Sequence, residues 1–249
     1  MGIIRASLTV VLCVGALAGA ASPVAANVIY EDVFYWVPDG QGGVRVLMNP
    51  AEAPVDAYVK IQETVYDDTQ ARAHLDLLTT IGAIHGDGLP TEAFDLYVYS
   101  ITNLNYIPDP PPGETGHGVA GYQVALTPSV ALLGIWAPDY ANVWWNRETE
   151  GLAVLWDIDD DHDGRLGDGW GILPAQTFGG LMLAVPAGTP HSREVEAQLW
   201  SWTGEEPQGI EFGNLVGLVS GPVPEPATMV LLGFGLLGLV VPRRRRRRT

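Results

Sequence analysis

The chain has 249 residues, with 13 lysines and arginines against 29 aspartates and glutamates, and its formal net charge at pH 7 is −16. Most basic residues lie at the two ends, so residues 27–222 carry 28 acidic and only six basic side chains, a net charge of −22. Such a surface repels nucleic acid and anionic lipid, so neither is expected as a partner of this region. The single cysteine, Cys13, lies near the N-terminus, so we expect no disulfide in the rest of the chain.

The first 26 residues have the pattern of a secretory signal peptide. Arg5 supplies a positive charge, residues 8–18 form an apolar core, and Val24-Ala25-Ala26 places small residues before a cut that precedes Asn27. We therefore expect an exported protein whose mature chain begins at Asn27.

Strand patterns dominate residues 27–221, which we expect to form one secreted domain. Apolar residues alternate with polar ones in runs separated by glycine, proline and asparagine, as in residues 55–66, where Val55, Ala57, Val59 and Ile61 share one face. The pattern predicts an all-β fold, either a β-sandwich or a jelly roll. The predicted strands are residues 28–36, 44–48, 55–66, 94–104, 122–127, 130–136, 152–156, 177–185, 195–202 and 210–219.

One short helix interrupts the strands, at residues 69–81. Ala71, Leu75, Leu78 and, at its end, Ile81 recur at helical spacing. Either Asp67 or Asp68 can cap its N-terminus, since an aspartate side chain accepts a hydrogen bond from the first turn.

An acidic loop at residues 157–168 is the sharpest internal motif. It contains Asp-x-Asp-x-Asp-Gly, and carboxylates two residues apart in a tight loop can converge on one hard cation. The loop resembles the calcium loops of EF-hands and dockerins, although its twelfth position is Trp170 in place of a glutamate. The resemblance implies a Ca²⁺ cofactor, and the alternative is a solvated acidic turn. The expected metal ligands are Asp159, Asp161, Asp163 and Asp168.

The tail combines three features in a fixed order. Val223-Pro224-Glu225-Pro226 is followed by an apolar segment, residues 227–241, and by a basic block. The prolines favour an extended, accessible backbone. The apolar segment predicts a short transmembrane helix, and arginines prefer the cytoplasmic side of a membrane and stop transfer. The stop-transfer residues are Arg243, Arg244, Arg245, Arg246, Arg247 and Arg248.

This tail, taken as residues 222–249, resembles the PEP-CTERM sorting signal of Gram-negative bacteria that make extracellular polysaccharide. The resemblance implies that an exosortase, a membrane protease or transpeptidase, recognises the Pro-Glu-Pro motif and removes the tail. The protein would then be held briefly in the inner membrane before it reaches the periplasm, the outer envelope or the extracellular matrix.

Two functions remain for the secreted domain. The five histidines form no metalloprotease pair, and no nucleophile motif surrounds Ser192, so no catalytic residue is predicted. We therefore favour a non-enzymatic structural or binding module, with extracellular polysaccharide as a candidate partner. The alternative is a secreted hydrolase acting on polysaccharide, which would need two carboxylates about 5–9 Å apart in a cleft.

Overall fold

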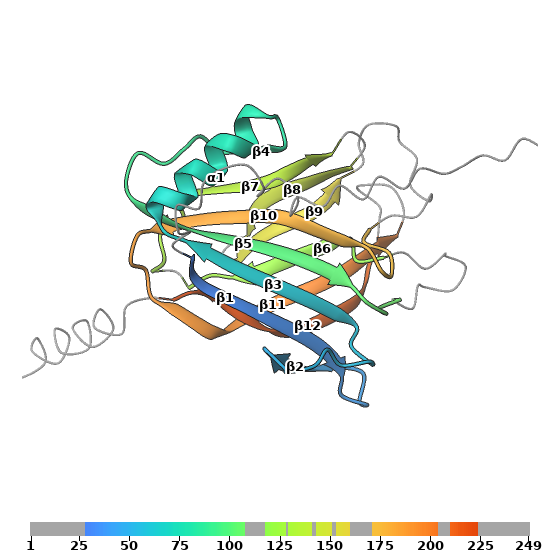
Figure 1. Ribbon diagram of the computed structural model, residues 1–249. Helices are drawn as coiled ribbons and strands as arrows, with labels where there is room; N and C mark the ends of the chain where they lie inside the picture. Colours follow the sequence, from blue (N-terminus) through green and yellow to red (C-terminus); the bar gives the residue numbers. More distant parts are fainter. Residues whose placement is uncertain are drawn as a thin grey trace, which may run out of the picture.

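The computed structural model describes residues 28–107, 118–127, 129–140, 143–150, 153–159, 171–203 and 210–223, in which strands predominate (Figure 1). In chain order the first elements are β1 (Val28–Pro38), β2 (Val44–Met48), β3 (Val59–Tyr66), α1 (Asp68–Thr80), β4 (Ile84–Gly86) and β5 (Phe94–Asn103). The others are β6 (Gly121–Ala125), β7 (Gly134–Tyr140), β8 (Val143–Glu150), β9 (Ala153–Asp159), β10 (Thr177–Pro186), β11 (His191–Thr203) and β12 (Ile210–Pro222).

The strands form two antiparallel sheets that lie face to face and are joined through β7. The strand order is β12-β11-β6-β9-β8-β7-β10-β5-β3-β1-β2, with β4 on the side of β7. The first part of β7 pairs with β10, whereas Asp139 and Tyr140 at its end pair with β8. This arrangement confirms the predicted all-β sandwich.

The main core lies between the two sheets. Phe34 and Trp36 point inward from β1, since alternate residues of a strand share one face. Tyr99, Tyr122 and Trp156 meet in the centre, with ring centroids 5.7 to 6.0 Å apart. Aromatic pairs at this separation contribute about 0.5–1.5 kcal/mol beyond the area they bury. The two sheets are therefore joined by large apolar side chains over most of their contact.

The helix α1 covers the outer face of the sheet that contains β1, β3, β5 and β10 (Figure 1). A second, smaller core lies between this helix and the sheet. The carboxylate of Asp67 caps the helix by accepting a hydrogen bond from the Gln70 N–H at 3.1 Å. The helix and its cap confirm the sequence prediction, but Ile81 is 55 % exposed at the C-cap and so lies outside the buried face. The second core consists of Ala71, Leu75, Leu78, Ile84, Phe94, Leu96, Trp136, Met182 and Ala184.

Several strand boundaries differ from the prediction. Residues 55 and 56 form a turn, which the Ala57 N–H closes by donating to the Pro54 carbonyl, and β3 begins only at Val59. The strand expected at residues 130–136 runs from Gly134 to Tyr140. The short β4 and the charged β8 were not predicted, because neither has an alternating apolar pattern. Within the described part of the chain, no helix is long and apolar enough to cross a membrane.

Candidate functional site: a buried cluster of charged side chains

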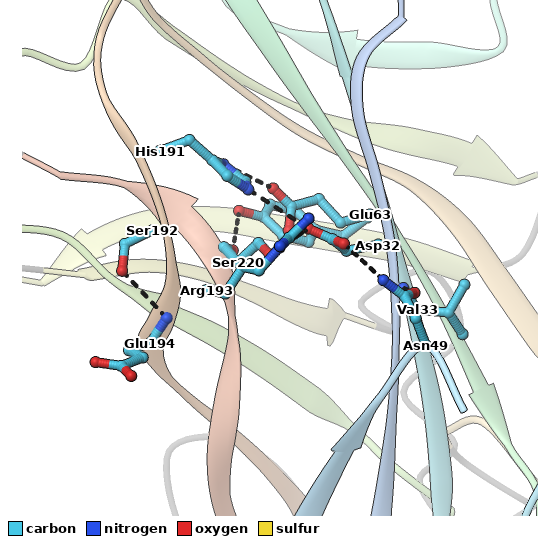
Figure 2. Close-up of polar contacts among 10 residues, drawn as sticks. Asp32, Val33, Asn49, Glu63, His191, Ser192, Arg193, Glu194 and Ser220 are labelled. Atoms are coloured by element: carbon cyan, nitrogen blue, oxygen red, sulfur yellow. Dashed lines mark hydrogen bonds and ion pairs between the residues drawn. The ribbon is translucent and has the colours of Figure 1, made fainter. Parts of the chain in front are cut away.

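Five polar side chains from four strands meet at one end of the sandwich, four of them largely buried and Arg193 half-exposed, and we call them the charged cluster. They are Asp32 of β1, Glu63 of β3, His191 and Arg193 of β11, and Ser220 of β12 (Figure 2). Asp32 and Glu63 lie directly opposite each other on neighbouring strands, and both are only 1 % exposed. Glu63 continues the inward face of β3, so its carboxyl group occupies a position that an apolar side chain would otherwise fill.

Asp32 is the hydrogen-bonded member of the charged cluster. It accepts from the Arg193 Nε at 2.9 Å, the Asn49 Nδ2 at 2.8 Å and the Ser220 Oγ at 3.1 Å. Asn49 adopts the left-handed backbone region with φ 44°, which asparagine tolerates well. Burial acts to raise the pKa of Asp32, but the hydrogen bonds from Arg193, Asn49 and Ser220 outweigh it and hold the pKa below its usual value. Asp32 is therefore the ionised carboxylate of the cluster.

Glu63 and His191 lack such partners. Neither carboxylate oxygen of Glu63 accepts a hydrogen bond, and His191 Nδ1 lies 3.9 Å from Oε1. The ring of Tyr30 stacks on His191 with centroids 4.2 Å apart. Burial raises the pKa of Glu63 well above its usual value, and this effect outweighs the nearby Ser220 hydroxyl, which acts to lower the pKa, while the charge of Asp32 adds to the rise. Burial also lowers the pKa of His191, although Asp32 acts in the opposite direction.

The cluster therefore joins one ion pair, Asp32 with Arg193, to two groups whose uncharged forms are favoured. Two carboxyl groups with opposite pKa shifts can in principle divide the roles of acid and base. However, both are buried, so a polymer on the protein surface cannot contact them in this conformation. Within the described ranges, no group of three His, Cys, Asp or Glu side chains is arranged to hold a metal ion.

We predict that Glu63→Gln changes how stability depends on pH. Because the folded pKa of Glu63 lies above its unfolded value, the folded state binds more protons above about pH 4.5, and stability falls as pH rises through this window. The fall amounts to at most about 1.4 kcal/mol per pH unit and ends above the folded pKa. Glutamine mimics the protonated carboxyl group, so the variant should gain stability relative to wild type as pH rises from 4 to 8. Urea unfolding at several pH values measures the difference.

The control for this experiment is Glu196→Gln, on the exposed face of β11. The difference in stability between this variant and wild type should stay the same across the pH range. His191 and Asp32 titrate in all three proteins, so their effects largely cancel in the comparison. If the free energy of unfolding of Glu63→Gln changed with pH in the same way as that of wild type, burial would not control the protonation of Glu63.

The structure describes only part of the sites expected from the sequence. Val223 follows β12, packs against the main core, and donates its N–H to the Pro190 carbonyl at 2.8 Å. Asp159 ends β9, where its backbone lies opposite Trp144. Outside the described residues lie the signal peptide, Asp161, Asp163, Asp168, the rest of the sorting motif, the apolar segment and the arginine block.

The charged cluster was not predicted from the sequence. A signal for one member was present, since the alternation through Val59 and Ile61 places Glu63 on the apolar face of its strand. An acidic residue on a buried face needs either a partner or a proton. The other members carry no comparable local signal, because they come from β1, β11 and β12 and meet only in the folded chain.

Comparison with known proteins identifies the tail. The family described as the PEP-CTERM protein-sorting motif matches residues 222–247. No curated protein and no solved structure matches the chain. The β-sandwich with this tail is thus the cargo of a sorting system, and the chain is a PEP-CTERM sorting domain-containing protein. The motif implies processing by an exosortase and export to the cell envelope of a Gram-negative bacterium.

Proposed function

We propose that this protein is a structural or binding module of the envelope or extracellular matrix, without enzymatic activity, and that exosortase processing releases it from the inner membrane. The sorting motif supports the route, since it follows the last strand of the sandwich. The burial of Asp32 and Glu63 supports the absence of catalysis, because these opposed carboxyl groups face the interior of the protein. Extracellular polysaccharide is the partner we propose.

A panel of polysaccharides tests this proposal on purified protein covering residues 27–222. We expect retention on at least one polysaccharide and no release of reducing sugar from any of them. Failure to bind every member of the panel would count against the proposed partner. Hydrolysis would overturn the non-enzymatic function.

The alternative function, a secreted hydrolase acting on polysaccharide, is favoured by one observation. Asp32 and Glu63 lie opposite each other, and their pKa values are shifted in opposite directions, as a general acid and a general base require. The same panel distinguishes the two functions. A hydrolase would release reducing sugar, and Glu63→Gln would abolish the release while Glu196→Gln would not.

We also propose that the acidic loop binds Ca²⁺ through Asp159, Asp161, Asp163 and Asp168. Five aspartates between residues 157 and 163 repel one another without a cation, so binding favours the folded state. Millimolar Ca²⁺ should raise the melting temperature, by an amount equivalent to about 2.7 kcal/mol when Ca²⁺ is a hundredfold above Kd. Mg²⁺ should raise it less, because Mg²⁺ dehydrates reluctantly.

Calorimetry on wild type and on the double variant Asp159→Asn, Asp161→Asn measures this effect. The variant should keep its fold and lose the response to Ca²⁺. An equal response in both proteins would assign the ion to another place and leave the loop a solvated turn.

A further inference from the structure

The sandwich remains paired up to the point at which the sorting motif begins. His191 lies opposite Pro222 and Ser192 opposite Gly221 in the β11–β12 ladder. One residue further on, the Val223 N–H donates to the Pro190 carbonyl at 2.8 Å. Pro224 is the next residue, so no spacer separates the hydrogen-bonded Val223 from Pro224-Glu225-Pro226.

Contacts of Ser220 hold this end of β12 from inside the sandwich. Its hydroxyl group donates to Asp32 Oδ2 at 3.1 Å, and its carbonyl accepts from the Tyr99 hydroxyl at 3.3 Å (Figure 2 shows the first contact). Ser220 is fully buried. A register shift in β11 between Ser192 and Val195 places two residues, Arg193 and Glu194, opposite Ser220, and Arg193 bonds the same Asp32 carboxylate. The charged cluster thus connects β1 and β11 to the C-terminal end of β12.

A peptide bound as an extended strand uses its own backbone N–H and C=O groups to pair with its receptor. β12 lies at the edge of its sheet, so the backbone groups that residues 220–223 turn toward β11 are already paired, and the Ser220 carbonyl is occupied by the Tyr99 hydroxyl. These groups are not available to a protease while the end of β12 stays in place. Strand ends open locally at a lower free energy than the whole domain, and cleavage then follows the population of the open state. An enzyme that needs residues before the motif must wait for this opening.

We propose that the paired end of β12 controls the access of the exosortase to the sorting motif, and that the contacts of Ser220 set how often this end opens. The inference rests on the proposed processing of the tail and adds its regulation. The tail is removed from the fraction of molecules in which residues 220–223 have separated from β11. The charged cluster then acts as a latch between the folded domain and its processing site.

Two conservative variants of the full chain test the latch, in a host that contains the exosortase. Ser220→Ala removes the hydroxyl bond to Asp32, and Tyr99→Phe removes the hydroxyl bond to the Ser220 carbonyl. Each should speed loss of the tail in a pulse-chase experiment by about fivefold, which corresponds to the net loss of one hydrogen bond. The control is Leu78→Ala, in the second core beneath α1, which destabilises the domain away from β12.

A four-residue Gly-Ser spacer inserted between Val223 and Pro224 gives an independent test. The spacer separates Pro224-Glu225-Pro226 from the paired end of β12 and leaves the distance from these three residues to the apolar segment unchanged. It should therefore speed processing of the otherwise unchanged chain. In this spacer background, Ser220→Ala and Tyr99→Phe should have no further effect on processing. Glu225→Ala in the same spacer background should remain uncut if the motif directs processing. Cutting of that variant would contradict the proposed processing and not the latch.

The latch is overturned by either of two results. The first is equal processing of wild type, the spacer protein and both conservative variants. The second is an acceleration by Leu78→Ala as large as that by Ser220→Ala, since general unfolding would then explain the effect.

Discussion

Glu225→Ala should abolish removal of the tail and leave the full-length protein in the inner membrane. Glu225 is the sole charged residue between positions 222 and 242, and it stands between two prolines. Because proline lacks a backbone donor and fixes φ, the motif offers the enzyme an extended backbone with one carboxylate to recognise. Alanine removes that charge without altering the apolar segment or the arginines. Immunoblots of fractionated cells separate the processed form from the membrane-held form.

The matched control is Glu196→Ala, an exposed acidic residue on β11 that lies outside the bulge opposite Ser220. It should be processed as wild type is, because it lies outside the motif. Equal processing of Glu225→Ala and wild type in an exosortase-containing host would mean that this carboxylate is not recognised.

Trp36→Ala should destabilise the sandwich more than any other change considered, by about 3–5 kcal/mol. Trp36 has no exposed surface and donates its indole N–H to the Leu218 carbonyl on β12 at 3.3 Å. Its ring lies against Gly217, where an added Cβ would stand only 2.6 Å from Cε2. The substitution would therefore open a cavity between β1 and β12 and remove a hydrogen bond at the same time. Urea unfolding of residues 27–222 measures the loss.

Tyr35→Ala is the control for this prediction. Tyr35 is the neighbouring aromatic residue on β1, but its side chain is only half-buried and points to the other face of the strand. The loss of stability caused by Tyr35→Ala should therefore be clearly smaller than that caused by Trp36→Ala. Equal losses would show that the contact between β1 and β12 contributes little beyond aromatic area.

The sequence alone is sufficient for the features that depend on neighbouring residues. The helix could be predicted because Asp67, Ala71, Leu75 and Leu78 lie within a few turns of one another. Most strands could be predicted because alternation with period two is also local. The sorting motif needs no tertiary structure at all, since its recognition groups are consecutive residues.

Other features could be resolved only by folding. In β5, Phe94 and Leu96 pack under α1 while Tyr97 and Tyr99 enter the main core, so both faces of this strand are buried. A turn at residues 55 and 56, closed by a hydrogen bond from the Ala57 N–H to the Pro54 carbonyl, interrupts a run whose alternation looks continuous. Local pattern cannot report which second surface will cover a strand.

The charged cluster depends entirely on tertiary structure. Asp32 and Arg193 are 161 residues apart, and Asp32 and Ser220 are 188 residues apart, yet they form hydrogen bonds in the folded chain. The sequence by itself determined that this protein carries a sorting tail and a β-rich domain, because adjacent side chains encode both. Only the tertiary structure decided that the tail begins beside the ion pair of buried Asp32 with half-exposed Arg193, because long-range strand pairing brings β1, β11 and β12 together there.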